Sequence, residues 1–312
     1  MEILKELLIL IIGFFLLIKG ADWFVDGASK IADKFHIPQL VIGLTIVAFG
    51  TSAPEAAVGL AASANGNADI ALGNVVGSNI LNILLILGIT SLILPLSIQK
   101  STLFFEVPFV IAISAVLLFL GKNGNQLSTM DGVVLWVLFI IFFIYLIQLS
   151  RKNNGAADDI PAANKNDSFF KLIIITIIGL ISIVAGSKFT VSSASALASI
   201  MGLSERFIGL TIVAFGTSLP ELITSIMAAR KGKDEIAIGN VVGSNIFNIL
   251  FILGTTSLLF PINYAQGFIF DNIICILSVL LLWLCVFKTK KLGRIGGGIM
   301  VICYIAYFIN IL

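Results

Sequence analysis

The protein has 312 residues, of which 58% are hydrophobic and only 12% are charged, and its formal net charge is +2. With a mean hydropathy of +1.09, the chain is too apolar to be a water-soluble globular protein. The small net charge gives no reason to expect a nucleic-acid partner. The composition therefore predicts a protein that is embedded in a lipid bilayer.

Ten segments are long and apolar enough to cross the bilayer. A spanning helix needs about 20 mostly apolar residues to cross a hydrocarbon core about 30 Å thick. The predicted spans lie near residues 3–28, 38–63, 69–94, 102–120, 131–149, 169–197, 206–229, 236–259, 267–287 and 295–311. No small-residue cleavage site follows the first of them, so we expect a spanning helix there and not a removable signal. The sequence thus predicts an all-α polytopic membrane protein.

Lysine and arginine residues are distributed unevenly over the two faces of the membrane. If the loops alternate sides, one face collects fourteen of them and the other face three. By the positive-inside rule the richer face is cytoplasmic, which predicts that both termini are extracellular. Since each half has five spans, an odd number, the second half enters the membrane upside down. We therefore predict two inverted-topology five-helix repeats in the cell (plasma) membrane.

One long polar segment separates the two halves. Residues 151–168 read RKNNGAADDIPAANKNDS, and their Asn, Asp, Ala and Pro content cannot bury a core. We expect this segment to be a cytoplasmic linker. The chain then divides into a first repeat at 1–150, the linker, and a second repeat at 169–312.

An internal sequence repeat relates the halves. At an offset of 166 residues, 37–89 aligns with 203–255 without a gap, and 31 of the 53 pairs are identical. The identities form two blocks, IGLTIVAFGTSxPE and GNVVGSNIxNIL, which together span 42–84 in the first half and 208–250 in the second. Because polar groups at membrane depth are costly, drifting duplicates should lose them first. Their presence in both copies indicates a shared functional site.

Each copy of the first block contains a glutamate deep in an apolar run. A carboxylate at the bilayer centre costs about 2.5 to 3.5 kcal/mol on insertion scales. No Lys or Arg occurs in either block, so the compensating group is either a proton or a cation from outside. Glu55 and Glu221 together match the charge of one divalent ion, whereas acids that merely bonded neighbouring helices could be replaced by glutamine. We therefore predict that the two glutamates bind a metal ion.

A proline immediately precedes each glutamate. Pro54 and Pro220 lack the N–H that would bond the carbonyl four residues earlier, so each should break its helix. At membrane depth such a break is tolerated where the loose backbone faces protein or a water-filled cavity, and it points to a binding site. Thr51, Ser52 and Glu55 then offer hydroxyl, carbonyl and carboxylate oxygens within one turn. Ca2+ takes about six to eight oxygens, and the two copies together can provide most of them.

The second block adds a polar stripe. Three polar residues recur at every fourth position and so lie on one helix face. They are Asn74, Ser78 and Asn82 in the first half and Asn240, Ser244 and Asn248 in the second. The glycines of this block follow a small-xxx-small pattern, which alone would also be typical of plain helix packing. Beside the carboxylates, we interpret the stripe as the opposite wall of the site, where neutral oxygens would coordinate Na+ without excess charge.

The paired GTSxPE and GNVVGSN blocks resemble the alpha-repeats of the cation/calcium exchanger superfamily, in its microbial sodium/calcium exchanger branch. The resemblance covers nearly the whole chain. It implies a secondary active antiporter that exchanges Ca2+ for Na+ by alternating access, with discontinuous central helices and with the first and sixth spans as the moving helices. We expect no enzymatic activity, no prosthetic group and no protein partner, since the bound Ca2+ and Na+ are the transported substrates.

The resemblance also implies which residues hold the ions, in counterpart pairs from the two halves. The Ca2+ ligands would be the carboxylates of Glu55 and Glu221 and the backbone carbonyls of Thr51 and Thr217. The Na+ sites would draw on these carboxylates and on Ala48, Ser52, Ser78, Ala214, Ser218 and Ser244. The residues lining the middle of the site would be Asn82 and Asn248.

Two positions bear on the coupling ion. Some relatives carry an aspartate at the position of Asn82 or Asn248, and in potassium-dependent exchangers an acid there is associated with K+ use. Two asparagines favour independence from K+. The proton-coupled branch typically has a glutamate at the positions of Gly77 and Gly243, so glycine there makes H+/Ca2+ exchange the less favoured alternative.

A cation channel and an intramembrane enzyme are the other candidate classes. Channels usually build ion filters from several subunits around an axis, whereas this chain pairs two halves with predicted broken helices. An enzyme that used paired acids would need asymmetry between acid and base, and no His, Cys or Ser-Lys arrangement accompanies the glutamates. Both observations favour the exchanger.

Overall fold

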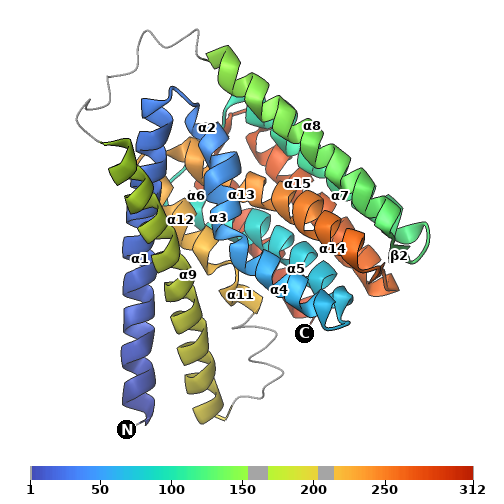
Figure 1. Ribbon diagram of the computed structural model, residues 1–312, viewed down its shortest axis with the longest axis horizontal. Coiled ribbons are helices and arrows are strands. Elements are labelled where there is room, and N and C mark those ends of the chain that lie inside the picture. Colours follow the sequence, from blue (N-terminus) through green and yellow to red (C-terminus); the bar gives the residue numbers. More distant parts are fainter. Residues whose placement is uncertain (1, 154–167, 203–213, 312) are drawn as a thin grey trace.

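The computed structural model describes residues 2–153, 168–202 and 214–311, and these are almost entirely helical (Figure 1). The elements of the first half, with η for a π-helical turn, are α1 (Glu2–Lys34), α2 (Gln39–Ile42), η1 (Gly43–Val47), α3 (Ala48–Thr51), α4 (Ala53–Ala64), α5 (Ala68–Leu81), η2 (Asn82–Leu87), α6 (Gly88–Ile93), β1 (Leu96–Ser97), η3 (Thr102–Glu106), α7 (Val107–Lys122), β2 (Gln126–Leu127) and α8 (Thr129–Asn153). Those of the second half are α9 (Phe169–Ile200), α11 (Ala214–Gly216), α12 (Leu219–Arg230), α13 (Asp234–Phe247), η6 (Asn248–Leu253), α14 (Gly254–Leu259), β3 (Ile262–Asn263), α15 (Gln266–Phe287), β4 (Lys291–Leu292) and α16 (Arg294–Ile311).

Seven helices in the described residues are long and apolar enough to cross a bilayer, and the number is eight if the bent pair Gln39–Thr51 and Ala53–Ala64 is counted as one broken span. The predicted all-helical membrane fold is therefore confirmed at this level. The predicted span near 206–229 includes residues 203–213, which lie outside the described residues, so α12 alone represents it. The predicted first span corresponds to α1, which is not among the seven. The total of ten thus stays a prediction.

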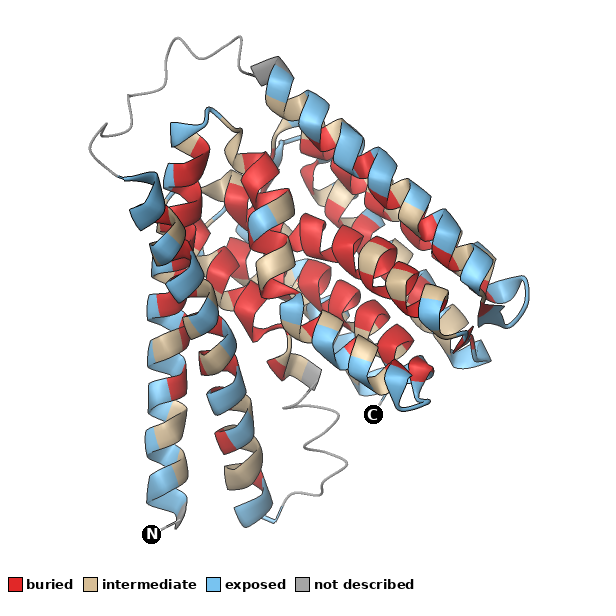
Figure 2. Ribbon diagram, viewed as in Figure 1, coloured by how far each residue is buried: buried red, intermediate tan, exposed pale blue. Residues whose placement is uncertain are grey.

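Two spans form the centre of the molecule. The segments α5–η2–α6 and α13–η6–α14 are largely buried, while the other spans expose apolar side chains on their outer faces (Figure 2). Lipid tails can solvate such apolar faces, but they offer no partner to polar groups. The fold accordingly encloses the second polar block of each half within a ring of apolar helices.

The helices α1 and α9 are counterparts in the repeat and lie against each other as a long pair at one side of the molecule (Figure 1). Glycines permit the close approach. A Cβ atom on Gly13 would lie 3.1 Å from the carbonyl oxygen of Gly186, and one on Gly20 would lie 2.9 Å from that of Gly179. Gly179 and Gly186 follow Gly13 and Gly20 by the repeat offset, so the contacts are reciprocal and the two helices run antiparallel.

Two short strand pairs show the same reciprocal arrangement. β1 pairs with β4, and Leu96 lies opposite Leu292, while β2 pairs with β3, and Leu127 lies opposite Ile262. In chain order β3 is the counterpart of β1, and β4 is that of β2. Each half therefore completes its two-stranded sheets with a strand from the other half.

The helix boundaries shorten the predicted linker. α8 continues to Asn153, so residues 151–153 are helical and not part of a loop. Residues 133–152 contain no glycine or proline, which explains why the helix continues up to the Asn-Asn-Gly sequence at 153–155. α9 begins at Phe169, after Ser168. Residues 154–167 lie outside the described residues, so the rest of the linker stays a prediction.

Candidate cation-binding site

The helix that carries Glu55 is broken where the sequence predicts it. α3 and α4 meet on either side of Ser52, and the segments before and after this residue form an angle of 47°. Pro54 occupies the first turn of α4, where a missing N–H is tolerated. α12 starts in the same way, with Ser218 before it and Pro220 in its first turn. Both glutamates therefore lie in the first turn of a helix, where the helix dipole stabilises negative charge.

Hydrogen bonds between the halves hold the two glutamates. Ser52 Oγ donates to Glu221 Oε1 at 2.8 Å, and Ser218 Oγ donates to Glu55 Oε1 at 3.2 Å. All four residues are at most 1% exposed. The broken helix of each half therefore positions the acid of the other half, and the two carboxylates belong to one site.

Four buried oxygens around this site have no donor. Oε2 of Glu55 and Oε2 of Glu221 accept no hydrogen bond within the described part of the chain, and neither do Oδ1 of Asn82 and Oδ1 of Asn248. The ion pairs found there include neither glutamate. An unpaired buried acceptor costs about 1–3 kcal/mol, and more if it is charged. Carboxylate and amide oxygens without donors are the kind of atoms that a cation binds.

Asn82 and Asn248 reach the site on π-helical turns. They begin η2 and η6, which continue α5 and α13. η2 packs against α12, which carries Glu221, and η6 packs against α4, which carries Glu55. Single π-helical turns inside longer helices are frequent at functional sites. The structure thus brings both predicted asparagines to the helices of the glutamates.

Two asparagines that were not predicted as site residues, Asn79 and Asn245, connect the two halves next to Asn82 and Asn248. Asn79 Nδ2 donates to the main-chain oxygen of Asn245 at 3.2 Å, and Asn245 Nδ2 donates to that of Asn79 at 3.1 Å. Asn245 Oδ1 accepts from Asn82 Nδ2 at 3.1 Å, and Asn79 Oδ1 accepts from Asn248 Nδ2 at 3.0 Å. All four asparagines are buried. Their shared GSN triplet was an available signal, but Asn79 and Asn245 lie off the four-residue spacing that defined the stripe.

The serines of the stripe also contact the broken helices. Ser78 Oγ lies 3.4 Å from Ser218 Oγ, and Ser244 Oγ donates to the main-chain oxygen of Ala48 at 3.5 Å. The carbonyl of Ala48 is thus directed towards the stripe of the opposite half. Its counterpart Ala214 begins α11.

The two threonines of the GTSxPE motifs have different surroundings. Thr51 Oγ1 donates to Asn240 Oδ1 at 2.9 Å, and Asn240 Nδ2 donates to the main-chain oxygen of Glu221 at 3.3 Å. The counterpart atoms, Thr217 Oγ1 and Asn74 Nδ2, have no hydrogen-bond partner within the ranges that the structure describes. The hydrogen bond between the motif threonine and the asparagine of the other half is therefore present for Thr51, and it is not found for Thr217 among the described residues.

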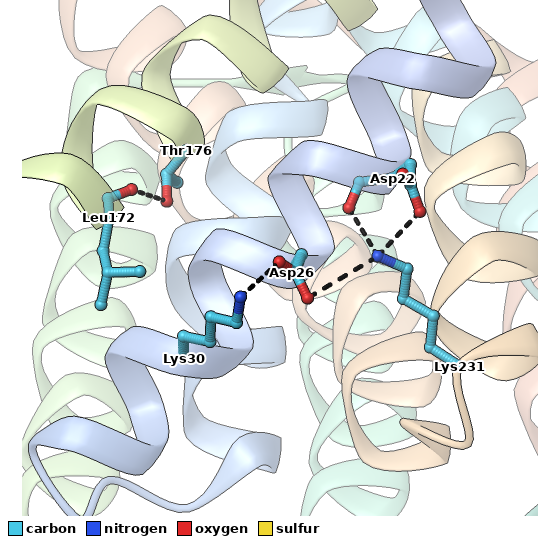
Figure 3. Close-up of polar contacts among 6 residues, drawn as sticks. All are labelled: Asp22, Asp26, Lys30, Leu172, Thr176 and Lys231. Atoms are coloured by element: carbon cyan, nitrogen blue, oxygen red, sulfur yellow. Dashed lines mark hydrogen bonds and ion pairs between the residues drawn. The ribbon is translucent and has the colours of Figure 1, made fainter. Parts of the chain in front are cut away.

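An ion-pair cluster joins the far end of α12 to α1 (Figure 3). Lys231 Nζ lies 2.8 Å from Asp22 Oδ1 and 3.9 Å from Asp26 Oδ1, and it donates to the main-chain oxygen of Asp22 at 2.7 Å. Lys30 pairs with Asp26 at 2.9 Å. The counterpart of Lys231 at the end of α4 is Asn65, which is exposed and donates to a carbonyl of its own helix. At the end of α4, Asn65 therefore does not form the ion pairs that Lys231 forms at the end of α12.

A third buried carboxylate lies outside the two motif blocks. Glu106, in η3, accepts a hydrogen bond from the hydroxyl of Tyr145 and is fully buried. The repeat offset matches it with Asn272, which is also buried. Glu106 is not predictable from the repeat, because it lies beyond the aligned segment and has no acidic counterpart.

Comparison with known proteins assigns the chain to a family. The family model described as "Sodium/calcium exchanger protein" matches residues 5–148 and 171–312. The chain belongs to the sodium/calcium exchanger family. This exchanger is 35% identical to inner membrane protein YrbG of Escherichia coli (strain K12) over 303 residues, which cover 94% of this chain and 92% of YrbG. It is 33% identical to sodium/calcium exchanger MaX1 of Methanosarcina acetivorans over 340 residues, with 97% of each chain covered.

A solved structure agrees with this assignment. The sodium-calcium exchanger NCX_Mj, soaked with 2.5 mM Na+ and 0.1 mM Ca2+, matches this exchanger with a TM-score of 0.86 at 32% identity, and 99% of each chain is covered. The family resemblance drawn from the two repeated blocks is confirmed, and the helices have the arrangement of a membrane transporter.

Proposed function

We propose that this exchanger moves Ca2+ across the membrane in return for Na+, through the site between Glu55 and Glu221. The observation that supports this function most strongly is the set of four buried oxygens without donors, two of them on carboxylates. Two carboxylates match the charge of one Ca2+, and oxygen is the ligand atom that Ca2+ and Na+ both accept. The ions with which NCX_Mj was soaked, Na+ with Ca2+ or Sr2+, support the same pair of substrates here.

The Ca2+ ligands in this proposal are the two carboxylates together with main-chain carbonyls of Thr51 and Thr217. The helix breaks beside Pro54 and Pro220 support this role, since a proline leaves a carbonyl without its usual donor. The Na+ sites use the same two carboxylates and further oxygens from Ala48, Ser52, Ser78, Ala214, Ser218 and Ser244. Asn82 and Asn248 line the middle of the site, within reach of either ion. Several oxygens are shared between the two sets, so Ca2+ and Na+ compete for them. This competition couples the two fluxes.

The proposed topology is ten spans in two inverted repeats, with residues 1–150 and 169–312 joined by a cytoplasmic linker. The antiparallel pairing of α1 with α9 and the crossed strand pairs support the inversion. In Figure 1 the marks for the N- and C-terminal ends lie in the lower half of the picture, and the end of α8 and the start of α9 lie in its upper half. Together with the lysine and arginine distribution, this arrangement supports extracellular termini in the cell membrane.

Flux in proteoliposomes tests the function. Uptake of 45Ca should require an outward Na+ gradient and should be lost in Glu55→Gln and in Glu221→Gln. Glu106→Gln is the matched control, because it removes a buried carboxylate outside the site and should leave Na+-dependent uptake in place. Uptake that followed a proton gradient instead would indicate H+/Ca2+ exchange. Uptake without any ion gradient would indicate a channel.

A further inference from the structure

The four buried asparagines form a hydrogen-bond chain whose polarity has one consistent assignment. The chain starts at main-chain carbonyls, which can accept but cannot donate. Asn79 and Asn245 each face the carbonyl of the other, at 3.2 and 3.1 Å, so the atom facing it must be Nδ2. The side-chain oxygen of each residue must then point away from that carbonyl.

This polarity passes on to the two asparagines of the site. Asn245 presents Oδ1, an acceptor, so Asn82 must face it with Nδ2, and Asn248 faces Asn79 in the same way. The other atom of each inner amide is Oδ1, which is buried and accepts no bond from the described residues. An amide has nearly the same shape in both orientations, so packing alone does not select one of them.

We propose that Asn79 and Asn245 are positioning residues of the transport site, which make Asn248 and Asn82 present oxygen, and not nitrogen, to the ions. This inference rests on the proposed function. An inverted amide would direct two N–H groups towards a cation in place of a lone-pair oxygen, and it would remove a ligand while adding repulsion. The hydrogen bonds of Asn79 and Asn245 thus make the wall opposite the glutamates present oxygen atoms, although neither of these two asparagines is itself a ligand.

Replacement of a positioning residue by leucine releases one inner amide. Asn245→Leu keeps the approximate size of the side chain but removes the oxygen that holds Asn82 Nδ2, so the amide of Asn82 can invert. We expect the Ca2+ concentration for half-maximal binding to rise roughly tenfold, as for the loss of one hydrogen bond to an ion. Asn272→Leu, at a buried asparagine outside the site, is the control and should leave this concentration unchanged.

A double-mutant cycle separates positioning from general stabilisation. Asn82→Asp replaces the amide by a carboxylate, which has oxygen at both ends and needs no orientation. With aspartate at position 82, Asn245→Leu should change Ca2+ binding by less than about twofold. No amide remains there to be oriented, and the leucine also removes Oδ1 of Asn245, which would repel the carboxylate. Equal losses in both backgrounds would overturn the proposal, since a purely structural defect does not depend on which group is at position 82.

The cycle is read by equilibrium 45Ca binding to the purified protein without Na+ and by Na+-driven uptake in proteoliposomes. If Asn245→Leu does not fold, the equivalent cycle of Asn79→Leu with Asn248→Asp tests the same inference from the other half. Ca2+ binding without Na+-driven uptake by the wild-type protein would contradict the exchange function alone, and the binding cycle would still decide the positioning. A wild-type protein that bound no Ca2+ would contradict both.

Discussion

α4 and α12 begin with the same motif, yet their surroundings differ. Each helix has 12 residues, of which eight are buried in α12 and three in α4. α1 packs along α12, whereas α9, the counterpart of α1, makes no comparable contact with α4 among the described residues. Thr51 bonds to Asn240, while Thr217 and Asn74 lack such a bond within the same ranges. The two helices share the Pro-Glu pair of the motif but differ at most other positions, so the difference in burial reflects both their side chains and the packing of α1 along α12.

This difference indicates one state of a transport cycle. α1 and the Lys231 cluster lie against the α12 side of the site, and no counterpart of either contact is found for α4 within the residues that the structure describes. In inverted repeats, alternating access arises when the two halves exchange such environments. With the topology proposed above, Lys231 lies near the cytoplasmic face, so we infer that the described state is closed towards the cytoplasm.

The two glutamates should matter equally in spite of their different surroundings. Glu55→Gln and Glu221→Gln each remove one of two charges that a divalent ion needs, so each should lower Na+-driven Ca2+ uptake by at least roughly a hundredfold. The rates are measured in proteoliposomes at matched protein density. If one variant kept near-normal uptake, the site would belong to one half only, and the pairing would be wrong.

A single methyl group in the α1–α9 contact should destabilise the protein. In Gly20→Ala the new Cβ would lie 2.8 Å from the main-chain nitrogen of Ile183, an atom that cannot rotate away. Overpacking of this kind costs about 1–3 kcal/mol. Gly267→Ala is the control, because no atom of the described chain lies within 4 Å of its Cβ position. Thermal unfolding in detergent should separate the two variants, and equal melting temperatures would contradict the packing described.

The threonine pair provides a matched test of the asymmetry. Thr51→Val removes the hydrogen bond to Asn240 and should lower the free energy of unfolding by about 1 kcal/mol. Thr217→Val removes a hydroxyl that lacks a partner in the described residues, so it should cost little or nothing. Both variants keep the main-chain carbonyl proposed as a ligand. Equal costs in denaturant unfolding would show that the two halves do not differ in solution.

The Lys231 cluster should have the smallest effect. Its ion pairs are partly exposed, and such pairs contribute about 0–1 kcal/mol. Lys231→Met removes the ion pairs between α12 and α1 and so weakens closure at the membrane face where Lys231 lies. The Ca2+ concentration for half-maximal transport, measured from this face, should therefore fall by at most about fivefold. Asn65→Ala, at the counterpart position, should change neither face. A rise from the Lys231 face would contradict the assigned role in closure.

Local chemistry made much of the site predictable from the sequence. Pro54 and Pro220 break their helices because proline lacks an N–H, and two buried acids in repeated motifs without basic residues indicate a cation. The difference between α4 and α12 was not predictable, because identical motifs carry no information about which half the α1–α9 pair covers. Asn79 and Asn245 were not predictable from spacing within one helix, because their hydrogen-bond partners lie across the interface between the two repeats.

Calcium binding to the purified protein tests the central claim most directly. Calorimetric titration at neutral pH without Na+ should show one Ca2+ bound per chain, displaced competitively by added Na+. The binding should be lost in Glu55→Gln and Glu221→Gln and kept in Glu106→Gln. If the wild-type protein bound no Ca2+, or bound it unchanged in the glutamine variants at positions 55 and 221, the assignment of this site would be wrong.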